Sequence, residues 1–278
     1  MRLPLTLAAL ALATPLLAAE ARICPPGEET CLDPAVLRQL ALDIGFGRED
    51  FRLPGDAAMW ADGRLRRFRR GRVPVEVYSD DPEMLEKAGF WDPFREITER
   101  LPALTGLRLV PRREVALWDA PPGLMIFVGS RDYLRESLVT LSRMAGADPE
   151  LAGDRFDALA RPFDLRGRPV CFAEVRFRDD RSAELALSIV ALEESEHLEE
   201  CVYEEVLQAL GPMNDSVRVD ETIFNDGAAE TVPTLYDWLA LSVLYDPRLE
   251  TGEAEASAAP VIEAIIGDLA RGASPPPE

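Results

Sequence analysis

The chain has 278 residues, and its 50 acidic and 30 basic residues give a formal net charge of −20. This excess of negative charge argues against nucleic acid as a partner, because phosphates would be repelled. The sequence contains one histidine, His197, which excludes a zinc site with three histidine ligands.

The first 21 residues have the pattern of a secretory signal peptide. Arg2 precedes an apolar run from Leu3 to Ala19, and a small-residue cleavage site follows at 18–21. We expect cleavage after Ala19 or Ala21 and a periplasmic location. No other segment is long and apolar enough to span a bilayer, so we expect no stable membrane span after cleavage. The alternative is that the run stays as an uncleaved anchor.

Four cysteines would then enter an oxidising compartment, where they favour disulfides over a metal or redox role. Four cysteines allow three pairings. Cys24 and Cys31 would close a short loop near the mature N-terminus, which leaves Cys171 and Cys201 for the second bridge. No Cys-x-x-Cys motif supports the metal or redox alternative.

Residues 22–60 are interpreted as an N-terminal extension with one helix, 34–42, which Asp33 would cap. Six arginines follow between positions 64 and 72. They indicate either a patch for anionic lipid or an acidic partner, or a basic segment that pairs with acidic neighbours before a strand. We favour the second interpretation.

Residues 61–250 are interpreted as one α+β domain with about five strands. Alternating or continuous apolar runs predict strands at 73–78, 107–111, 124–128, 168–178 and 184–192. Helical spacing predicts helices at 84–101, within the insertion 131–166, from about 194 to 210, and at 235–244. We expect residues 251–258 to form a linker and residues 261–270 to form a short final helix. Residues 274–278 are expected to be a frayed end.

The predicted helix that ends near residue 210 has the spacing of a zinc-protease active-site helix. That pattern is H-E-x-x-H, extended in one branch to H-E-x-x-H-x-x-G-x-x-H. Glu204, Gln208 and Asn214 stand at the three histidine positions. Glu205 stands at the glutamate position and Gly211 at the glycine position. We call these five positions the zinc-protease frame.

Residues 201–216, together with 223–226 and 234–249, resemble a family of secreted Gram-negative proteins. It is the domain-of-unknown-function family numbered twenty-nine twenty-seven, and it implies no activity. The third stretch also resembles the segment after the active-site helix of metzincins. The zincin likeness implies a mixed twisted sheet, a packing helix, a degenerate active-site helix and a smaller helical C-terminal half.

The same residues allow three functions. The first is a non-catalytic binding protein of the cell envelope, with an envelope protein or peptide as partner. The second is a hydrolase of metallopeptidase-like ancestry, with Glu204 and Glu205 as acid and base. In it Glu204, Gln208 and Asn214 could bind a metal, and their oxygen atoms suit Ca²⁺ or Mg²⁺ better than zinc. The third is a structural domain in which these polar groups form an internal network or face solvent.

Overall fold

The computed structural model describes residues 22–25, 30–47, 63–87, 89–114, 123–146, 148–177 and 183–272. The expected signal peptide at 1–21 and the expected frayed end at 274–278 lie outside these residues. The described part is an α+β fold, as the sequence predicts.

The centre of the fold is a five-stranded mixed sheet with the strand order β2-β1-β3-β5-β4. Strands β2, β1, β3 and β5 run parallel, and β4 runs antiparallel to β5. The strands are β1 (Gly71–Ser79), β2 (Leu107–Pro111), β3 (Leu124–Gly129), β4 (Cys171–Phe177) and β5 (Leu185–Glu193). All five expected strands are therefore confirmed, with shifts of a few residues at their ends.

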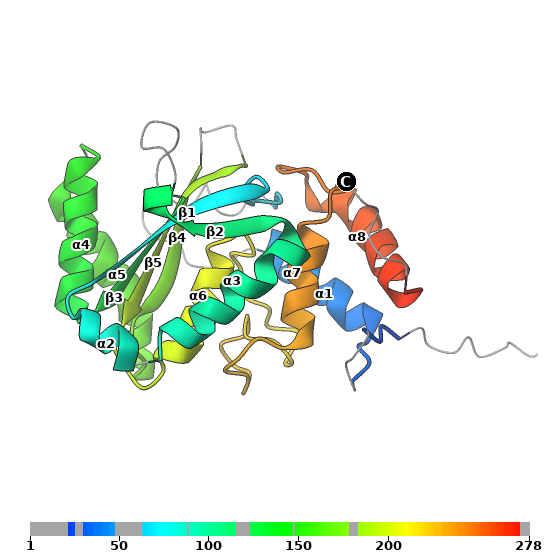
Figure 1. Cartoon of the computed structure of the whole chain (residues 1–278), viewed down its shortest axis with the longest axis horizontal. Coiled ribbons are helices and arrows are strands. Elements are labelled where there is room, and N and C mark those ends of the chain that lie inside the picture. Colours follow the sequence, from blue (N-terminus) through cyan, green and yellow to red (C-terminus); the bar gives the residue numbers. More distant parts are fainter. Residues whose placement is uncertain are drawn as a thin grey trace, which may run out of the picture.

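Helices cover both faces of the sheet (Figure 1). The helices α4 (Arg131–Met144) and α5 (Pro149–Arg166) lie on one face, and α3 (Trp91–Thr105) and α6 (Leu198–Gln208) lie on the other. The remaining helices are α1 (Pro34–Phe46), α2 (Pro82–Lys87), α7 (Leu235–Leu244) and α8 (Glu255–Ala270). A short 3₁₀ turn occupies Arg112–Glu114.

The two faces of the sheet build two hydrophobic clusters. In β3, Leu124, Ile126 and Val128 pack in the larger cluster, whereas Met125 and Phe127 pack in the smaller one beneath α4 and α5. Successive side chains of a strand point to opposite faces, so this alternation follows from strand geometry. Because both faces are covered, every position of β3 is buried, which explains its continuous apolar sequence.

The region expected to form a helix at 84–101 is divided into α2 and α3. Gly89 lies between the two helices with φ +79°, a left-handed conformation that glycine adopts without a steric penalty. The helix α3 begins at Trp91 and places Ile97 and Leu101 in the core.

The expectation of a linker at 251–258 is wrong. Helix α8 begins at Glu255, and Ala258 is completely buried. Backbone hydrogen bonds also join Leu65 to Gly252 and Glu253. Helices α1, α7 and α8 pack on one another, and their apolar residues belong to the same cluster as the sheet.

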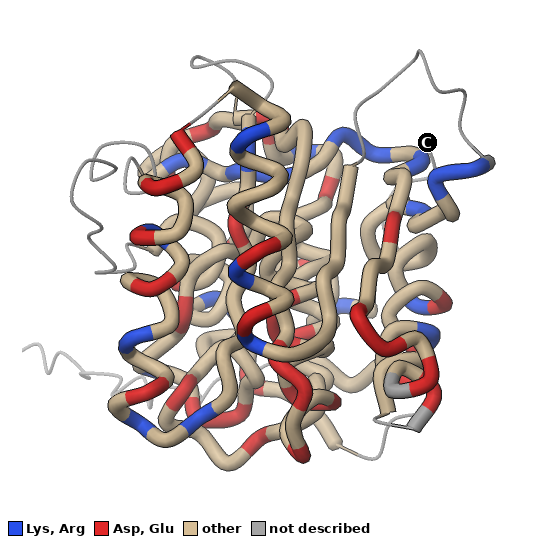
Figure 2. The backbone as a smooth tube through the Cα atoms, turned by 90° about the vertical axis from the view of Figure 1, so that its left-hand side faces the viewer, with Lys and Arg blue, Asp and Glu red and all other residues tan. Residues whose placement is uncertain are grey.

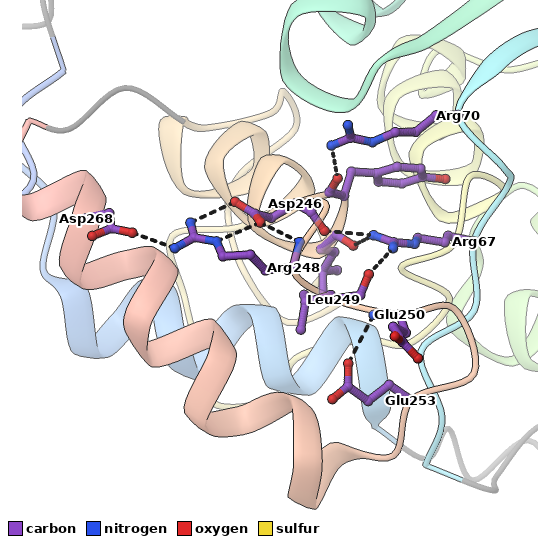
Figure 3. Close-up of polar contacts among 10 residues, drawn as sticks. Arg67, Arg70, Asp246, Arg248, Leu249, Glu250, Glu253 and Asp268 are labelled. Carbon is purple, nitrogen blue, oxygen red and sulfur yellow. Dashed lines mark hydrogen bonds and ion pairs between the residues drawn. The ribbon is translucent and has the colours of Figure 1, made fainter. Parts of the chain in front are cut away.

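The arginine-rich segment contributes a structural contact at the end of α7 (Figure 3). The Arg67 guanidinium is buried and donates to the carbonyl oxygens of Leu244 and Leu249 and to Thr251 Oγ1. Arg70 donates to the Tyr245 carbonyl oxygen. These carbonyls lie at or just beyond the C-terminus of α7, where carbonyl groups lack helical partners. The binding interpretation of this segment thus does not apply to Arg67.

Candidate functional site

A cleft runs along the free edge of β4, between α5 on one face of the sheet and α6 on the other. We call it the β4 cleft, and its volume is ≈ 200 Å³. Its apolar lining includes Leu159, Phe163, Phe172, Val175 and Met213. Its acidic lining consists of Glu174, Glu200, Glu204, Glu205, Asp215 and Asp226, and its arginines are Arg155, Arg166 and Arg168. The disulfide Cys171–Cys201 also lies in the lining and joins β4 to α6.

The main chain of β4 offers hydrogen-bonding groups to the cleft. Within the described residues, β4 has a neighbouring strand on one side only. Glu193 N–H donates to the Val170 carbonyl oxygen at 2.8 Å, and the same register pairs Ala173 with Val190. Bonded and non-bonded pairs alternate along an antiparallel ladder. The N–H and C=O groups of Ala173 and Val175 therefore point away from β5, toward the cleft.

The end of α6 explains the glycine of the zinc-protease frame. Gly211 has φ +140°, and a Cβ atom at this position would lie 2.4 Å from the Arg66 carbonyl oxygen. A side chain would therefore need a strained backbone and would also collide with the neighbouring main chain. Structural packing is sufficient to account for glycine at this position.

Glu204 lies half-buried in the β4 cleft. No donor in the described part of the chain hydrogen-bonds to its carboxylate. Burial raises the pKa of Glu204 well above its usual value, and the nearby charges of Asp215, Asp226 and Glu200 raise it further. Arg168 opposes this effect. Glu204 is therefore only partly exposed to solvent.

Asp215 is another half-buried carboxyl in the cleft. It accepts a hydrogen bond from Gln208 Nε2 at 2.9 Å. Burial and the charge of Asp226 raise the pKa of Asp215 to about 6, while the bond from Gln208 and the charge of Arg166 act in the opposite direction. The charge of Asp215 is in turn one of the causes that raise the pKa of Glu204.

The three candidate metal ligands all line the cleft, but two of them have protein partners. Gln208 is bonded to Asp215, and Asn214 Nδ2 donates to the Ile44 carbonyl oxygen of α1 at 3.2 Å. Among the described residues, no group of three or more His, Cys, Asp or Glu side chains is placed to hold a metal ion. The set of Glu204, Gln208 and Asn214 includes two amide side chains, and this observation does not cover amides. Metal binding by these three residues therefore stays a prediction.

Glu205 also lines the cleft, and it is 5% exposed. A carboxyl group at the glutamate position of the frame is thus buried. Its role as a base stays a prediction. His197 is exposed at the N-terminus of α6, with Nδ1 3.5 Å from Glu200 Oε2.

The sequence does not predict two parts of the cleft. Helix α5 contributes several residues to the lining, and Asp226 of the lining forms an ion pair with Arg166 of that helix. Asp226 is found in an Asn-Asp-Gly turn, which gives no signal beyond turn formation. The contribution of α5 depends on tertiary packing, for which the sequence contains no local signal.

The fold and the cleft define an α+β protein with a cleft beside β4, the antiparallel edge strand of its mixed sheet. Apolar and charged side chains line this cleft. The family model described as "Protein of unknown function (DUF2927)" matches residues 42–264, and the chain belongs to this family. The expected family is thus confirmed. No curated protein and no solved structure matches the chain.

The expected disulfides Cys24–Cys31 and Cys171–Cys201 are both present. Disulfides persist in oxidising compartments, so they fit an extracellular or periplasmic protein. Over the described ranges, no helix has both the length and the apolar character needed to cross a membrane.

Proposed function

We propose that this protein is a non-catalytic binding protein of the periplasm, with a zincin-like fold, that holds an extended polypeptide in the β4 cleft. The zincin-like assignment is supported by helix α6, the next element after the last strand, which carries Glu204, Glu205 and Gln208 of the zinc-protease frame. Gly211 and Asn214 of the frame follow the helix. A helical C-terminal half after this helix supports it as well.

The observation that carries the proposal is the outward-facing main chain of β4 inside a lined cleft. An extended peptide can add a strand to an exposed sheet edge, where main-chain hydrogen bonds provide affinity and side-chain pockets provide specificity. The cleft supplies both, because apolar groups of α5 and charged groups of α6 flank the edge of β4.

The polar groups of the frame favour binding over catalysis. The one histidine of the chain is at position 197, outside the frame. Gln208 and Asn214 use their amide groups to hold Asp215 and helix α1. These two side chains therefore make structural hydrogen bonds within the protein that do not depend on any metal.

A strand-addition test follows from the geometry of Ala173. In Ala173→Pro the N–H that points into the cleft is removed, whereas the ladder to β5 does not use that group. Ala173→Ser keeps the N–H and serves as the matched control. The mature, oxidised protein is assayed against an immobilised library of extended hexapeptides. We expect binding by the wild type and by Ala173→Ser, and at least tenfold weaker binding by Ala173→Pro. Equal binding by all three proteins would refute strand addition.

A second function, hydrolysis, is favoured by one observation. Two carboxyl groups with raised pKa values, Glu204 and Asp215, share the cleft, and general acid–base catalysis at neutral pH needs such groups. Glu205 would be the base in this alternative. Cleavage of library peptides that is lost in both Glu204→Gln and Glu205→Gln would establish the hydrolase. Uncleaved peptides that remain bound would support the binding protein.

A further inference from the structure

We propose that the bound polypeptide places an arginine or lysine side chain between Glu204 and Asp215 of the β4 cleft. This inference rests on the proposed function, and it names the residue type that the cleft selects.

The first step is the charge balance of the cleft. Asp226 forms an ion pair with Arg166, and Arg168 lies 4.0 Å from both Glu200 and Asp226. At the other end of the cleft, Glu174 pairs with Arg155 at 3.4 Å.

Glu204 and Asp215 differ from these acids, because neither forms an ion pair within the described ranges. The arginines nearest to them are already engaged by Asp226 and Glu200. The cleft therefore contains two carboxyl groups whose negative charge is not balanced by a direct partner among the described residues.

The second step is the cost of that arrangement. Taking a carboxylate out of water is unfavourable unless it is hydrogen-bonded or paired with a cation. Glu204 receives no hydrogen bond within the described chain, although it is half-buried in the cleft. A cation that enters the cleft would supply the missing partner. The pKa values of both groups, raised by burial and by neighbouring acids, are consistent with this need.

The third step distinguishes a basic side chain from a metal ion. Ca²⁺ requires six to eight oxygen ligands, and Mg²⁺ requires near-octahedral geometry. Among the described residues, no three His, Cys, Asp or Glu side chains are placed to hold a metal ion, and Gln208 adds only one amide oxygen beside Glu204 and Asp215. An arginine has a planar fork of five donors that matches carboxylates, and a lysine has three donors. Both have long apolar stems, which Phe163 and Met213 of the lining can contact.

The fourth step is the route by which the side chain arrives. Strand addition to β4 would fix the main chain of the partner along one wall of the cleft, opposite α6. Side chains of an added strand alternate between the two faces of the sheet. Every second residue of the partner would therefore point toward α6, which carries Glu204 and Gln208.

The test uses the same immobilised library of extended hexapeptides. In each set of peptides, one position is fixed to a single amino acid, and the fixed position is changed from set to set. We expect enrichment of arginine or lysine at one position. The best arginine peptide is then compared with the same peptide containing citrulline, which has the shape of arginine without its charge. The citrulline peptide should bind at least tenfold more weakly, because charge-assisted hydrogen bonds are lost.

Variants assign this difference to the two carboxyl groups. In Glu204→Gln and in Asp215→Asn, the preference for arginine over citrulline should shrink severalfold, since each removes one negative charge. Glu199→Gln is the matched control. Glu199 is exposed on the same helix, outside the cleft lining, and its replacement removes the same charge. Thermal melting of each variant verifies that it is folded, and two independent acidic variants guard against the failure of one.

The outcomes separate the two proposals. Peptide binding with no basic preference would overturn this inference and leave strand addition intact. A basic preference that is equally reduced by Glu199→Gln would also overturn it, since the attraction would then come from the overall charge. Failure of every peptide to bind would overturn both proposals.

Discussion

At the scale of single residues, the cleft is characterised by carboxyl groups that are partly withdrawn from water. Asp215 follows Asn214 directly in the sequence, and the sequence alone predicts a turn for both. The structure gives them different roles. Asn214 binds the main chain of α1, whereas Asp215 faces the cleft and receives a bond from Gln208. Which residue of a turn points into a cavity depends on the packing around that turn.

The raised pKa of Asp215 has a consequence for stability. The pKa of Asp215 in the folded protein is about 6, against an ordinary value of 3.8. The folded protein therefore binds this proton more tightly than the unfolded chain does. The stabilisation from this tighter proton binding is fully present below the ordinary pKa of 3.8, and it is lost as the pH rises through the folded pKa of about 6.

Asp215→Asn cannot ionise and keeps an oxygen that can accept from Gln208. We expect it to raise the free energy of unfolding at pH 7 by about 1 kcal/mol, after allowance for partial exposure, and to change it much less at pH 4. Denaturant unfolding at the two pH values measures the effect. Asp220→Asn, at an exposed acid of the same loop, is the control. A lower stability of Asp215→Asn at pH 7 would contradict this reasoning.

At the scale of elements, local sequence patterns identify the strands well because each is a compact apolar run between turn residues. The 107–111 strand and the 235–244 helix have the expected bounds. The start of α8 has no local signal, because its first residues are small or acidic and exposed, and the main-chain bonds that place them run to residues 63–65, far away in the sequence. The position of β4 at the sheet edge was not predicted either, because strand order is set by pairing between distant segments.

The arginine-rich segment is also explained at this scale. Its residues were expected to pair with acidic neighbours, but Arg67 instead binds main-chain carbonyls beyond α7. Farther along the same network, Arg248 bridges Asp246 and Asp268 and so connects the end of α7 to α8 (Figure 3). Long-range contacts of this kind have no local sequence signature.

Arg67→Met would keep the length of the side chain and remove its donors. Because the carbonyl groups would be left buried without this partner, we expect a loss of about 3 kcal/mol in the free energy of unfolding. Arg69→Met is the matched control within the same segment, since Arg69 is exposed. Urea unfolding of both variants gives the comparison. Similar stabilities for the two would show that the contacts of Arg67 contribute little.

At the scale of the whole molecule, acidic and basic residues are interspersed on the face that carries α4 and α5 (Figure 2). The net charge of −20 is thus not concentrated in one segment of the chain. The cleft is a local feature within this distribution, and its shape depends on the positions of β4, α5 and α6. The disulfide Cys171–Cys201 joins two of these three elements.

Replacing both Cys171 and Cys201 by serine would release β4 from α6. The bridge spans a sequence separation of 30. Its loss should reduce the free energy of unfolding by about 3–4 kcal/mol in the chain-entropy description. We also expect weaker peptide binding, measured with the hexapeptides on protein verified to be folded. Serine at both Cys24 and Cys31 should leave peptide binding unchanged. Full binding after the loss of Cys171–Cys201 would show that the cleft does not need this bridge.

Amide hydrogen exchange, followed residue by residue by NMR with and without a bound hexapeptide, tests strand addition to β4 most directly. The N–H groups of Ala173 and Val175 point into the cleft, whereas those of Phe172 and Glu174 belong to the ladder with β5. We predict that the peptide slows exchange at Ala173 and Val175 and leaves Phe172 and Glu174 nearly unchanged. Unchanged exchange at Ala173 and Val175 in the peptide-bound protein would contradict the proposed function.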